Sequence, residues 1–261
     1  MRMIVLVKQV PDPQHIKIDP KTGFVVRTGV PLIVNPFDLY AVELALRIKS
    51  EYDGEIIAVS MGPPSAEEAL REVLAMGVDK AILLTDRRMA GADTLATSYT
   101  LSMAIKKVGG FDLVLAGEKT VDGDTGHIGP EVAEFLGIPH VCYVSNYEGV
   151  REGYIYVRAR YDDYLLRLKV KLPALLTVTR GELRPRIPTI LGRLRASKIP
   201  ITKWNADDIE CDISRIGLQG SPTRVLEVFT PRYGRKCKMF YGDPKELAKK
   251  FIDVLKELGF V

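Results

Sequence analysis

A regular alternation of short apolar runs with helical patterns constrains the fold of this chain more than any other feature. The apolar runs are rich in Val, Ile and Leu, which is typical of parallel strands buried on both faces. Longer segments with apolar residues at helical spacing lie between them. This order predicts right-handed crossovers and an α/β fold with a doubly wound, mostly parallel sheet. The predicted strands are Met3 to Val10, Glu55 to Ser60, Lys80 to Thr85 and Leu113 to Ala116.

Capping residues predict where the helices begin and end. Asn35 precedes Pro36, and this pair suits the N-cap and the first position of a helix. Ser65 with Glu68 matches a capping box for a second helix, which Gly77 ends. The other predicted helices are Asp93 to Val108 and Glu131 to Leu136.

The pattern changes in two other parts of the chain. Two short extended pieces around residues 19–23 predict a small hairpin between residues 16 and 27. Beyond Pro139, charged residues alternate with apolar ones, which predicts antiparallel strands with one face in water. Residues 201–224 have no regular pattern, and Asp243 to Leu258 predicts an amphipathic helix after a basic arm, Arg232 to Lys238. The later strands are His140 to Ser145, Tyr154 to Arg160, Tyr164 to Lys171 and Leu175 to Thr179.

The stretch from Gly117 to Glu131 is a long loop between a predicted buried strand and a predicted helix. Its glycines allow backbone bends, and Thr125 could cap the helix or bond a phosphate oxygen. Backbone N–H groups at a helix start attract anions, and ligands of open parallel sheets bind beyond the carboxyl ends of strands. The stretch therefore predicts a cradle for a nucleotide diphosphate, with an ordinary connecting loop as the alternative. Its glycines are Gly117, Gly123, Gly126 and Gly129.

Composition narrows the class of protein. Apolar residues make up 46% of the 261 residues and charged residues 27%, which is ordinary for a globular chain. A net charge of +4 is too small to predict nucleic-acid binding. No signal pattern opens the chain, no run is long enough to span a bilayer, and three widely spaced cysteines predict neither disulfides nor a metal site. We expect a cytoplasmic protein that does not insert into a membrane.

Several blocks together resemble the beta subunit of electron transfer flavoproteins, in order and at that family's spacing. One departure is 161–164, Tyr-Asp-Asp-Tyr, where the family usually has an acidic turn containing Gly. The resemblance implies a Rossmann-like, adenine nucleotide hydrolase-like α/β fold with an antiparallel hairpin and a C-terminal extension. The blocks are Val7 to Val10, Asn35 to Asp38, Ser60 to Pro63, Leu74 to Asp79, Val121 to Asp124, Leu172 to Thr177 and Pro185 to Pro188.

The resemblance also implies a heterodimer with an alpha subunit, which carries the electron-transferring FAD, and an adenine nucleotide in the sheet of this chain. Residues 1–200 would form the nucleotide-binding domain, and 201–261 a C-terminal arm and helix that pack on the alpha subunit. No protein acid, base, nucleophile or metal is required for such chemistry. By position, the nucleotide would contact Leu6, Asn35, Pro36, Phe37, Asp38, Met61, Thr120, Val121, Asp122, Gly123, Asp124, Thr125, Gly126, His127, Ile128, Gly129, Pro130 and Glu131.

Two branches of the family hold different nucleotides at this position. In one the beta subunit holds a structural AMP; in the other it holds a second FAD, which oxidises NADH and splits its two electrons. The small Gly126 and Gly129, the Gly-Pro pair and the Thr125 hydroxyl resemble the FAD-holding branch. One electron would then go through the alpha-subunit FAD to a quinone reductase or dehydrogenase, and the other to ferredoxin.

Each of these residues also has a structural interpretation. Asp122 and Asp124 could cap turns, and His127 could be a solvated loop residue. Met61 could fill the core, and Asn35 is expected to cap a helix whatever else it does. Tyr40, Tyr99 and Tyr143 are expected in the core or at an interface, and Cys142 as a small buried hydrophobe.

The segment 183–199 mixes arginines with apolar residues, which suits a docking loop for partner dehydrogenases better than a solvated basic face. By position in the family, Ile190 would be the anchor, with Leu191 and Leu194 beside it. Two other classes share a similar sheet: universal-stress-type modules that bind ATP, and enzymes that activate substrates with ATP. The length beyond residue 140 argues against the first. Enzymes of the second class usually have a Ser-Gly-Gly loop after the first strand. This chain has Val10 to Pro13 at that position, which argues against the second class.

Overall fold

The computed structural model describes residues 1–261 except 16, 19–24, 27–28, 225, 227–236 and 238. The chain forms two compact units, Met1–Glu227 and Val228–Val261, and each is described by itself. The first unit extends beyond residue 200, where the sequence analysis set its boundary. The turn of the small predicted hairpin and most of the basic arm lie outside the described residues.

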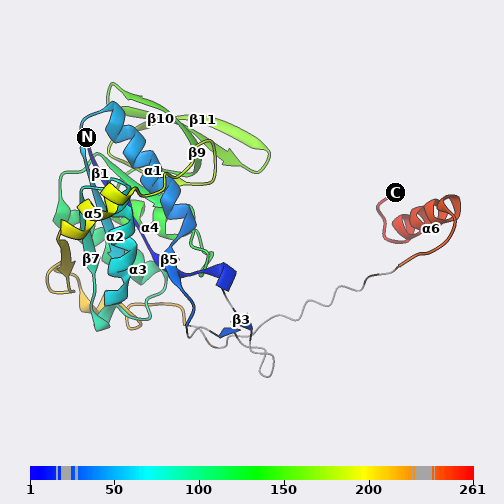
Figure 1. The fold of residues 1–261 in the computed structure, drawn as a ribbon, viewed down its shortest axis with the longest axis horizontal. Coiled ribbons are helices and arrows are strands. Elements are labelled where there is room, and N and C mark those ends of the chain that lie inside the picture. Colours follow the sequence, from blue (N-terminus) through cyan, green and yellow to red (C-terminus); the bar gives the residue numbers. More distant parts are fainter. Residues whose placement is uncertain (16, 19–24, 27–28, 225, 227–236, 238) are drawn as a thin grey trace. The chain divides into compact units, whose positions relative to one another are not determined.

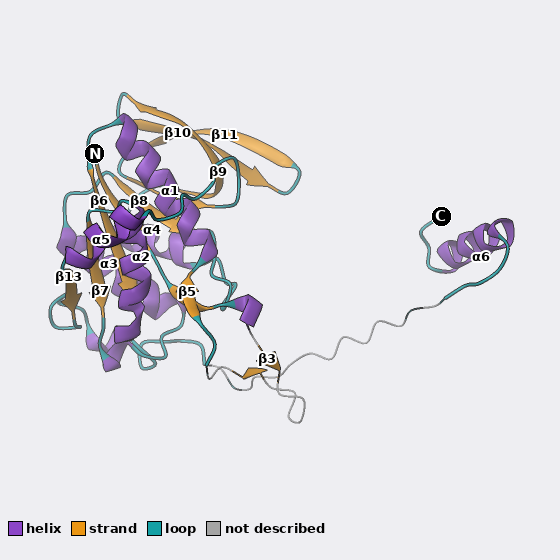
Figure 2. Ribbon diagram, viewed as in Figure 1, coloured by secondary structure: helices purple, strands orange, loops and turns teal. Residues whose placement is uncertain are grey.

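A nine-stranded sheet forms the centre of the first unit, in the order β11-β10-β9-β12-β8-β1-β6-β7-β13. Figure 2 draws its strands in orange among the purple helices. The strands from β9 to β13 along this order run parallel, and β9, β10 and β11 form an antiparallel extension at one edge. The predicted α/β fold with a mostly parallel sheet is thereby confirmed. The strands are β1 (Arg2–Leu6), β6 (Glu55–Met61), β7 (Lys80–Leu84), β8 (Leu113–Gly117), β9 (His140–Arg151), β10 (Tyr154–Tyr161), β11 (Tyr164–Lys171), β12 (Ala174–Val178) and β13 (Ile201–Trp204).

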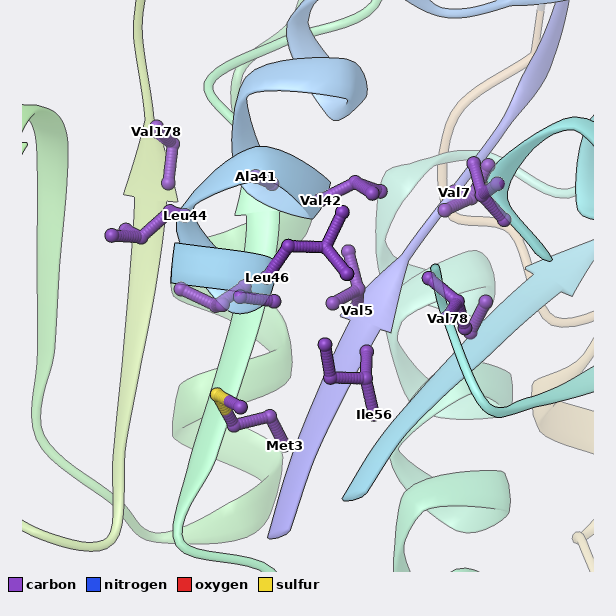
Figure 3. Close-up of a cluster of buried hydrophobic side chains, with 14 of the residues drawn as sticks. Met3, Val5, Val7, Ala41, Val42, Leu44, Leu46, Ile56, Val78 and Val178 are labelled. Carbon is purple, nitrogen blue, oxygen red and sulfur yellow. The ribbon is translucent and has the colours of Figure 1, made fainter. Parts of the chain in front are cut away.

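Helices cover both faces of this sheet because residues along each central strand alternate between two cores. On β1, Met3 and Val5 pack with helices α1 (Pro36–Glu51) and α2 (Glu67–Met76), as Figure 3 shows in part. Ile4 and Leu6 point the other way and pack with α3 (Thr94–Val108) and α4 (Ile128–Leu136). A fifth helix, α5 (Ile190–Lys198), lies against α2 on the first face (Figure 1).

The neighbouring strands β1 and β8 form the switch point of the fold. The chain leaves β1 for α1 on one face, and it leaves β8 for α4 on the other. Loops that diverge in this way from adjacent parallel strands open a crevice beyond their carboxyl ends. The loop after β8 is the predicted nucleotide loop, so the topology brings it to the expected edge.

Two short sheets depart from the predicted first strand. Met3 to Val10 does not form one strand: β1 ends at Leu6, and β2 (Gln9–Pro11) pairs antiparallel with β5 (Leu32–Val34) instead. The predicted hairpin is present in its described residues as β3 (Lys17–Ile18) paired with β4 (Val25–Val26). A short 3₁₀ turn, η1 (Pro13–His15), lies between β2 and β3.

The predicted capping box is wrong. Ser65 lies inside a 3₁₀ turn, η2 (Pro64–Ala66), and α2 begins at Glu67 without a side-chain cap. The Ser65 hydroxyl donates a hydrogen bond to Gln9 instead, at 3.3 Å. Other boundaries are confirmed: Gly77 ends α2 with a φ of 131°, and the Asp93 carboxylate caps α3 by accepting from the Ala96 N–H at 3.0 Å. A further 3₁₀ turn, η3 (Arg87–Met89), precedes α3.

Regular structure extends into the segment that the sequence analysis left irregular. Residues Ile201–Trp204 form β13, which pairs in parallel with β7 at the sheet edge, and η4 (Ile213–Arg215) follows. A four-residue edge strand with only half-buried apolar residues has little pattern for sequence analysis to detect.

In the second unit, Asp243 caps α6 (Pro244–Glu257) by accepting from the Lys245 N–H at 2.9 Å. Two of its large apolar residues are exposed, Phe251 at 58% and Ile252 at 46%. None of the helices in the described parts of the chain is long and apolar enough to cross a membrane.

Candidate functional site

Asn35 joins the start of α1 to the loop after β8. Its side chain is fully buried. The amide nitrogen donates to the Asp38 carboxylate at 2.8 Å and to the Lys119 carbonyl at 2.9 Å, and the amide oxygen accepts from the Val121 N–H at 3.2 Å. Asn35 therefore occupies the N-cap position without making a side-chain cap bond, which corrects the expectation that it simply caps the helix.

Asp38 is buried beneath this junction. Its carboxylate accepts hydrogen bonds from the Asn35 amide and from the Lys8 backbone N–H, the latter at 2.7 Å. Burial raises the pKa of Asp38 to about 7, although hydrogen bonds from Asn35, Lys8 and Gly117 oppose the rise. The carboxyl group thus stays partly protonated near neutral pH.

Gly117, at the end of β8, presses directly against the first turn of α1. A Cβ atom there would lie 2.4 Å from the Asp38 carboxylate and 2.8 Å from the Phe37 carbonyl carbon. No larger residue fits without moving backbone, so the strand end and the helix start are held in contact. The sequence analysis attributed this glycine to a backbone bend, whereas close approach of two elements is the physical reason.

The two loop aspartates are paired with lysines. The Lys8 ammonium lies 2.8 and 3.0 Å from the Asp122 carboxylate oxygens, and Lys119 lies 2.7 Å from Asp124. Burial acts against ionisation of Asp122, but hydrogen bonds from Lys8 and Thr120 hold its pKa below the usual range. The ion pair with Asp124 raises the pKa of Lys119. The loop is therefore tied to the residues just after β1, and both of its aspartates are paired with lysines.

The helix after the loop begins earlier than predicted. α4 starts at Ile128 rather than Glu131, with His127 at its N-cap position and no side-chain cap bond. Gly126 has a φ of 69°, in the left-handed region that favours glycine. A Cβ atom on Gly129 would lie 2.2 Å from the Thr177 methyl carbon of β12, so this turn of α4 sits tightly on the sheet. Among the described residues, the exposed side chains of Thr125 and His127 make no hydrogen bond.

The remaining predicted contacts are distributed around this centre. Phe37 lies beside the loop, with the Lys119 ammonium 5.9 Å from its ring centroid. Leu6 and Met61 are the last residues of β1 and β6, at the carboxyl edge of the sheet. Both side chains pack in the core that includes residues of α3 and α4. The Glu131 carboxylate accepts from the hydroxyls of Thr94 and Ser98 of α3, at 3.1 and 2.9 Å, and thus ties two helices together.

Sequence analysis missed two residues of this arrangement. Lys8 bonds to Asp38 through its backbone and to Asp122 through its side chain. Its place as the first charged residue after an apolar strand was the available signal. Thr177 supports Gly129 from a strand fifty residues later, and no local pattern announces such a contact.

The predicted docking segment forms a helix rather than a loop. Thr189 caps α5 by accepting from the Gly192 N–H at 3.0 Å, and the Arg195 guanidinium donates to the Leu74 and Val78 carbonyls at 2.6 and 3.1 Å. Arg186 forms a two-pronged ion pair with Glu43 at 2.8 Å.

These contacts fix the helix while its apolar side chains face outward. Two arginines of the segment, Arg186 and Arg195, thus anchor it to the body of the protein. The exposed fractions are 85% for Ile187, 80% for Ile190, 78% for Leu191 and 57% for Leu194.

The chain is similar to known proteins along nearly its whole length. A model of the electron transfer flavoprotein domain matches residues 22–209. An electron transfer flavoprotein subunit beta from Thermoanaerobacterium thermosaccharolyticum is 45% identical over 98% of both chains. The caffeyl-CoA reductase-Etf complex subunit CarD of Acetobacterium woodii is 46% identical, again over 98% of both chains. Protein FixA of Sinorhizobium fredii is 43% identical over 99% of this chain and 92% of its own.

Proposed function

Since the chain belongs to the electron transfer flavoprotein family, as a beta subunit, we propose that it binds FAD at the switch point between β1 and β8. The observation that supports this most is the junction built by Asn35, which ties the start of α1 to the loop at 119–121. A loop held so firmly at a switch point is pre-organised for a ligand.

The residues present fit an adenine nucleotide with a diphosphate. The start of α4 supplies backbone N–H groups, which favour phosphate oxygens. Gly126 and Gly129 keep side chains away from this turn, and the exposed Thr125 hydroxyl could bond a second phosphate. Leu6 and Met61 border the apolar floor expected beneath an adenine ring. Lys8 and Lys119 offset the charge of Asp122 and Asp124, which lowers the repulsion that the acidic sequence of the loop would exert on an anion.

When bound, the FAD would take a hydride from NADH and release single electrons to the FAD of an alpha subunit and to ferredoxin. The residues of this chain would hold and orient that group and supply no acid, base or nucleophile. Asn35 would fix the loop over the nucleotide, and Gly117 would keep β8 and α1 in register. The CarD relative is a subunit of a caffeyl-CoA reductase-Etf complex, which favours a comparable redox assembly here.

Two surfaces suit the partners that this function requires. The apolar side of α5, with Ile190 at its centre, would dock a quinone reductase or dehydrogenase. The exposed apolar residues of α6 would pack on the alpha subunit. In this arrangement Met1–Glu227 acts as the nucleotide-binding part and Val228–Val261 as the arm.

The other candidate is a non-bifurcating beta subunit that holds AMP as a structural element. The same turn at the start of α4 would accept a single phosphate, so the geometry of the loop supports it as well. The Gly-Pro pair at Gly129 and Pro130 and the hydroxyl of Thr125 favour the longer nucleotide.

Counting the nucleotides of the heterodimer separates these candidates. The chain is purified with its alpha subunit, the nucleotides are released by denaturation, and FAD and AMP are quantified by chromatography. We expect two FAD per heterodimer and bleaching of flavin absorbance by NADH under anaerobic conditions. One FAD and one AMP per heterodimer, with no response to NADH, would establish the AMP form instead.

A further inference from the structure

The strand β9 carries an irregularity next to the proposed nucleotide site. Its parallel register with β12 pairs His140 with Leu175 and Val141 with Leu176, and then shifts, so that the next pair is Val144 with Val178. Cys142 and Tyr143 therefore stand together opposite Thr177. Such bulges redirect side chains and are frequent beside functional sites.

Tyr143 adopts an unusual backbone conformation at this bulge. Its φ is 58°, in the left-handed region that residues other than glycine seldom occupy. Conformations of this kind are energetically unfavourable and persist where the surroundings impose them. The Tyr143 N–H donates to the Thr177 hydroxyl at 3.1 Å, which is one such constraint.

The strand order places Tyr143 close to the nucleotide loop, because only β12 lies between β9 and β8. The methyl group of Thr177 faces Gly129 in the first turn of α4, so only one side chain separates the Tyr143 backbone from that turn. At the start of the loop, Val178 of β12 pairs with Gly117 of β8 on one side and with Val144, the residue after Tyr143, on the other.

The ring of Tyr143 is oriented but not buried. It packs edge-on against Tyr161, the last residue of β10, with the ring centroids 5.6 Å apart and the planes at 89°. Yet 42% of Tyr143 and 36% of Tyr161 remain exposed. Tyr143 was expected in the core or at an interface, and its exposure excludes only the core. The two rings form an oriented, partly exposed aromatic pair.

We propose that Tyr143 contacts the flat ring system of a bound flavin dinucleotide, beyond the phosphates held at the start of α4. This inference rests on the proposed function, because AMP ends at the phosphate and would not reach past the helix start. Thr177 and Tyr161 act as positioning residues that fix the backbone and the ring plane of Tyr143. Aromatic rings held in this way favour planar conjugated partners by stacking or edge contact.

The test compares FAD with AMP on the same protein. The heterodimer, with its alpha-subunit flavin in place and its second nucleotide removed, is titrated with each nucleotide by calorimetry. Tyr143→Ala should weaken FAD binding about 3- to 10-fold and leave AMP binding unchanged, whereas Tyr143→Phe should retain both affinities. Tyr154→Ala is the matched control, since Tyr154 begins β10 at the opposite end of the strand from Tyr161.

The outcomes distinguish this inference from the proposed function. FAD binding that is the same in Tyr143→Ala and in the unsubstituted chain overturns the role of Tyr143 alone. Equal weakening of FAD and AMP also overturns it, because that result marks a structural residue. An unsubstituted heterodimer that binds AMP but no second FAD overturns both.

Discussion

Replacing Asn35 with alanine tests whether the junction between α1 and the nucleotide loop carries the site. The change deletes the three hydrogen bonds that the Asn35 side chain makes to Asp38, Lys119 and Val121. A hydrogen bond contributes about 1 kcal/mol net, and a buried group left without a partner costs about 1–3 kcal/mol. We expect a loss of about 3 kcal/mol in the free energy of unfolding, and a melting temperature lower by about 6–12 °C.

The same change should weaken nucleotide binding, because the loop at 119–121 loses its attachment and must be ordered by the ligand. Denaturant unfolding measures the stability, and titration of the emptied heterodimer with AMP measures the affinity. We expect an AMP Kd at least about 10-fold higher, which corresponds to about 1.4 kcal/mol.

Asn146→Ala is the matched control. Asn146 is also a buried asparagine, and its side chain bonds to Glu182 at 2.7 Å and to the Tyr147 N–H at 2.8 Å, on the antiparallel side of the sheet. It should lower stability without changing the Kd for AMP. If Asn35→Ala kept the original Kd, or if Asn146→Ala raised it equally, the reasoning from the junction would be refuted.

Three further changes test other parts of the account. Gly129→Ala forces a Cβ atom to within 2.2 Å of the Thr177 methyl carbon. We expect the free energy of unfolding in denaturant to fall by about 1–3 kcal/mol, with loss of bound nucleotide. The control Gly123→Ala, whose Cβ would be 3.4 Å from its nearest neighbour, should be close to neutral. Burial raises the folded-state pKa of Asp38 to about 7. The free energy of unfolding of the unsubstituted chain, relative to that of Asp38→Asn, should therefore fall as the pH rises from 4 to 8, by at most about 4 kcal/mol. A difference between the two proteins that does not change with pH would contradict the raised pKa of this buried carboxyl. Ile190→Asp, at a residue 80% exposed, should slow electron transfer to the partner dehydrogenase in steady-state assays and leave nucleotide content intact, and loss of nucleotide would count against a docking role.

The sequence predicted those parts of the fold that depend on periodicity. Runs of Val, Ile and Leu identify the central parallel strands, because a strand that is covered on both faces is apolar along its whole length. The hairpin of β10 and β11 was equally clear from the alternation of apolar and charged residues. The short strands β2 and β13 were missed, since three or four half-buried residues carry no period.

Within the candidate site, several side chains make other contacts than the sequence predicted. Asn35 was expected to cap a helix, but its amide instead forms hydrogen bonds with the backbone of residues 119 and 121, far along the chain. Ser65 and Glu68 match a capping box by spacing, yet the Ser65 hydroxyl bonds to Gln9. Both errors have one cause. A local sequence pattern shows that a residue can cap a helix, but tertiary contacts decide which group its side chain bonds to. Glu131 similarly bonds to α3 rather than lining the loop.

A crystal structure of the heterodimer purified with its natural nucleotides tests the central claim most directly. The account predicts the nucleotide beyond the carboxyl ends of β1 and β8, with its phosphates on the backbone at 125–129 and a flavin ring beside Tyr143. A nucleotide bound elsewhere on the chain, or this edge filled by side chains of the alpha subunit, would contradict it.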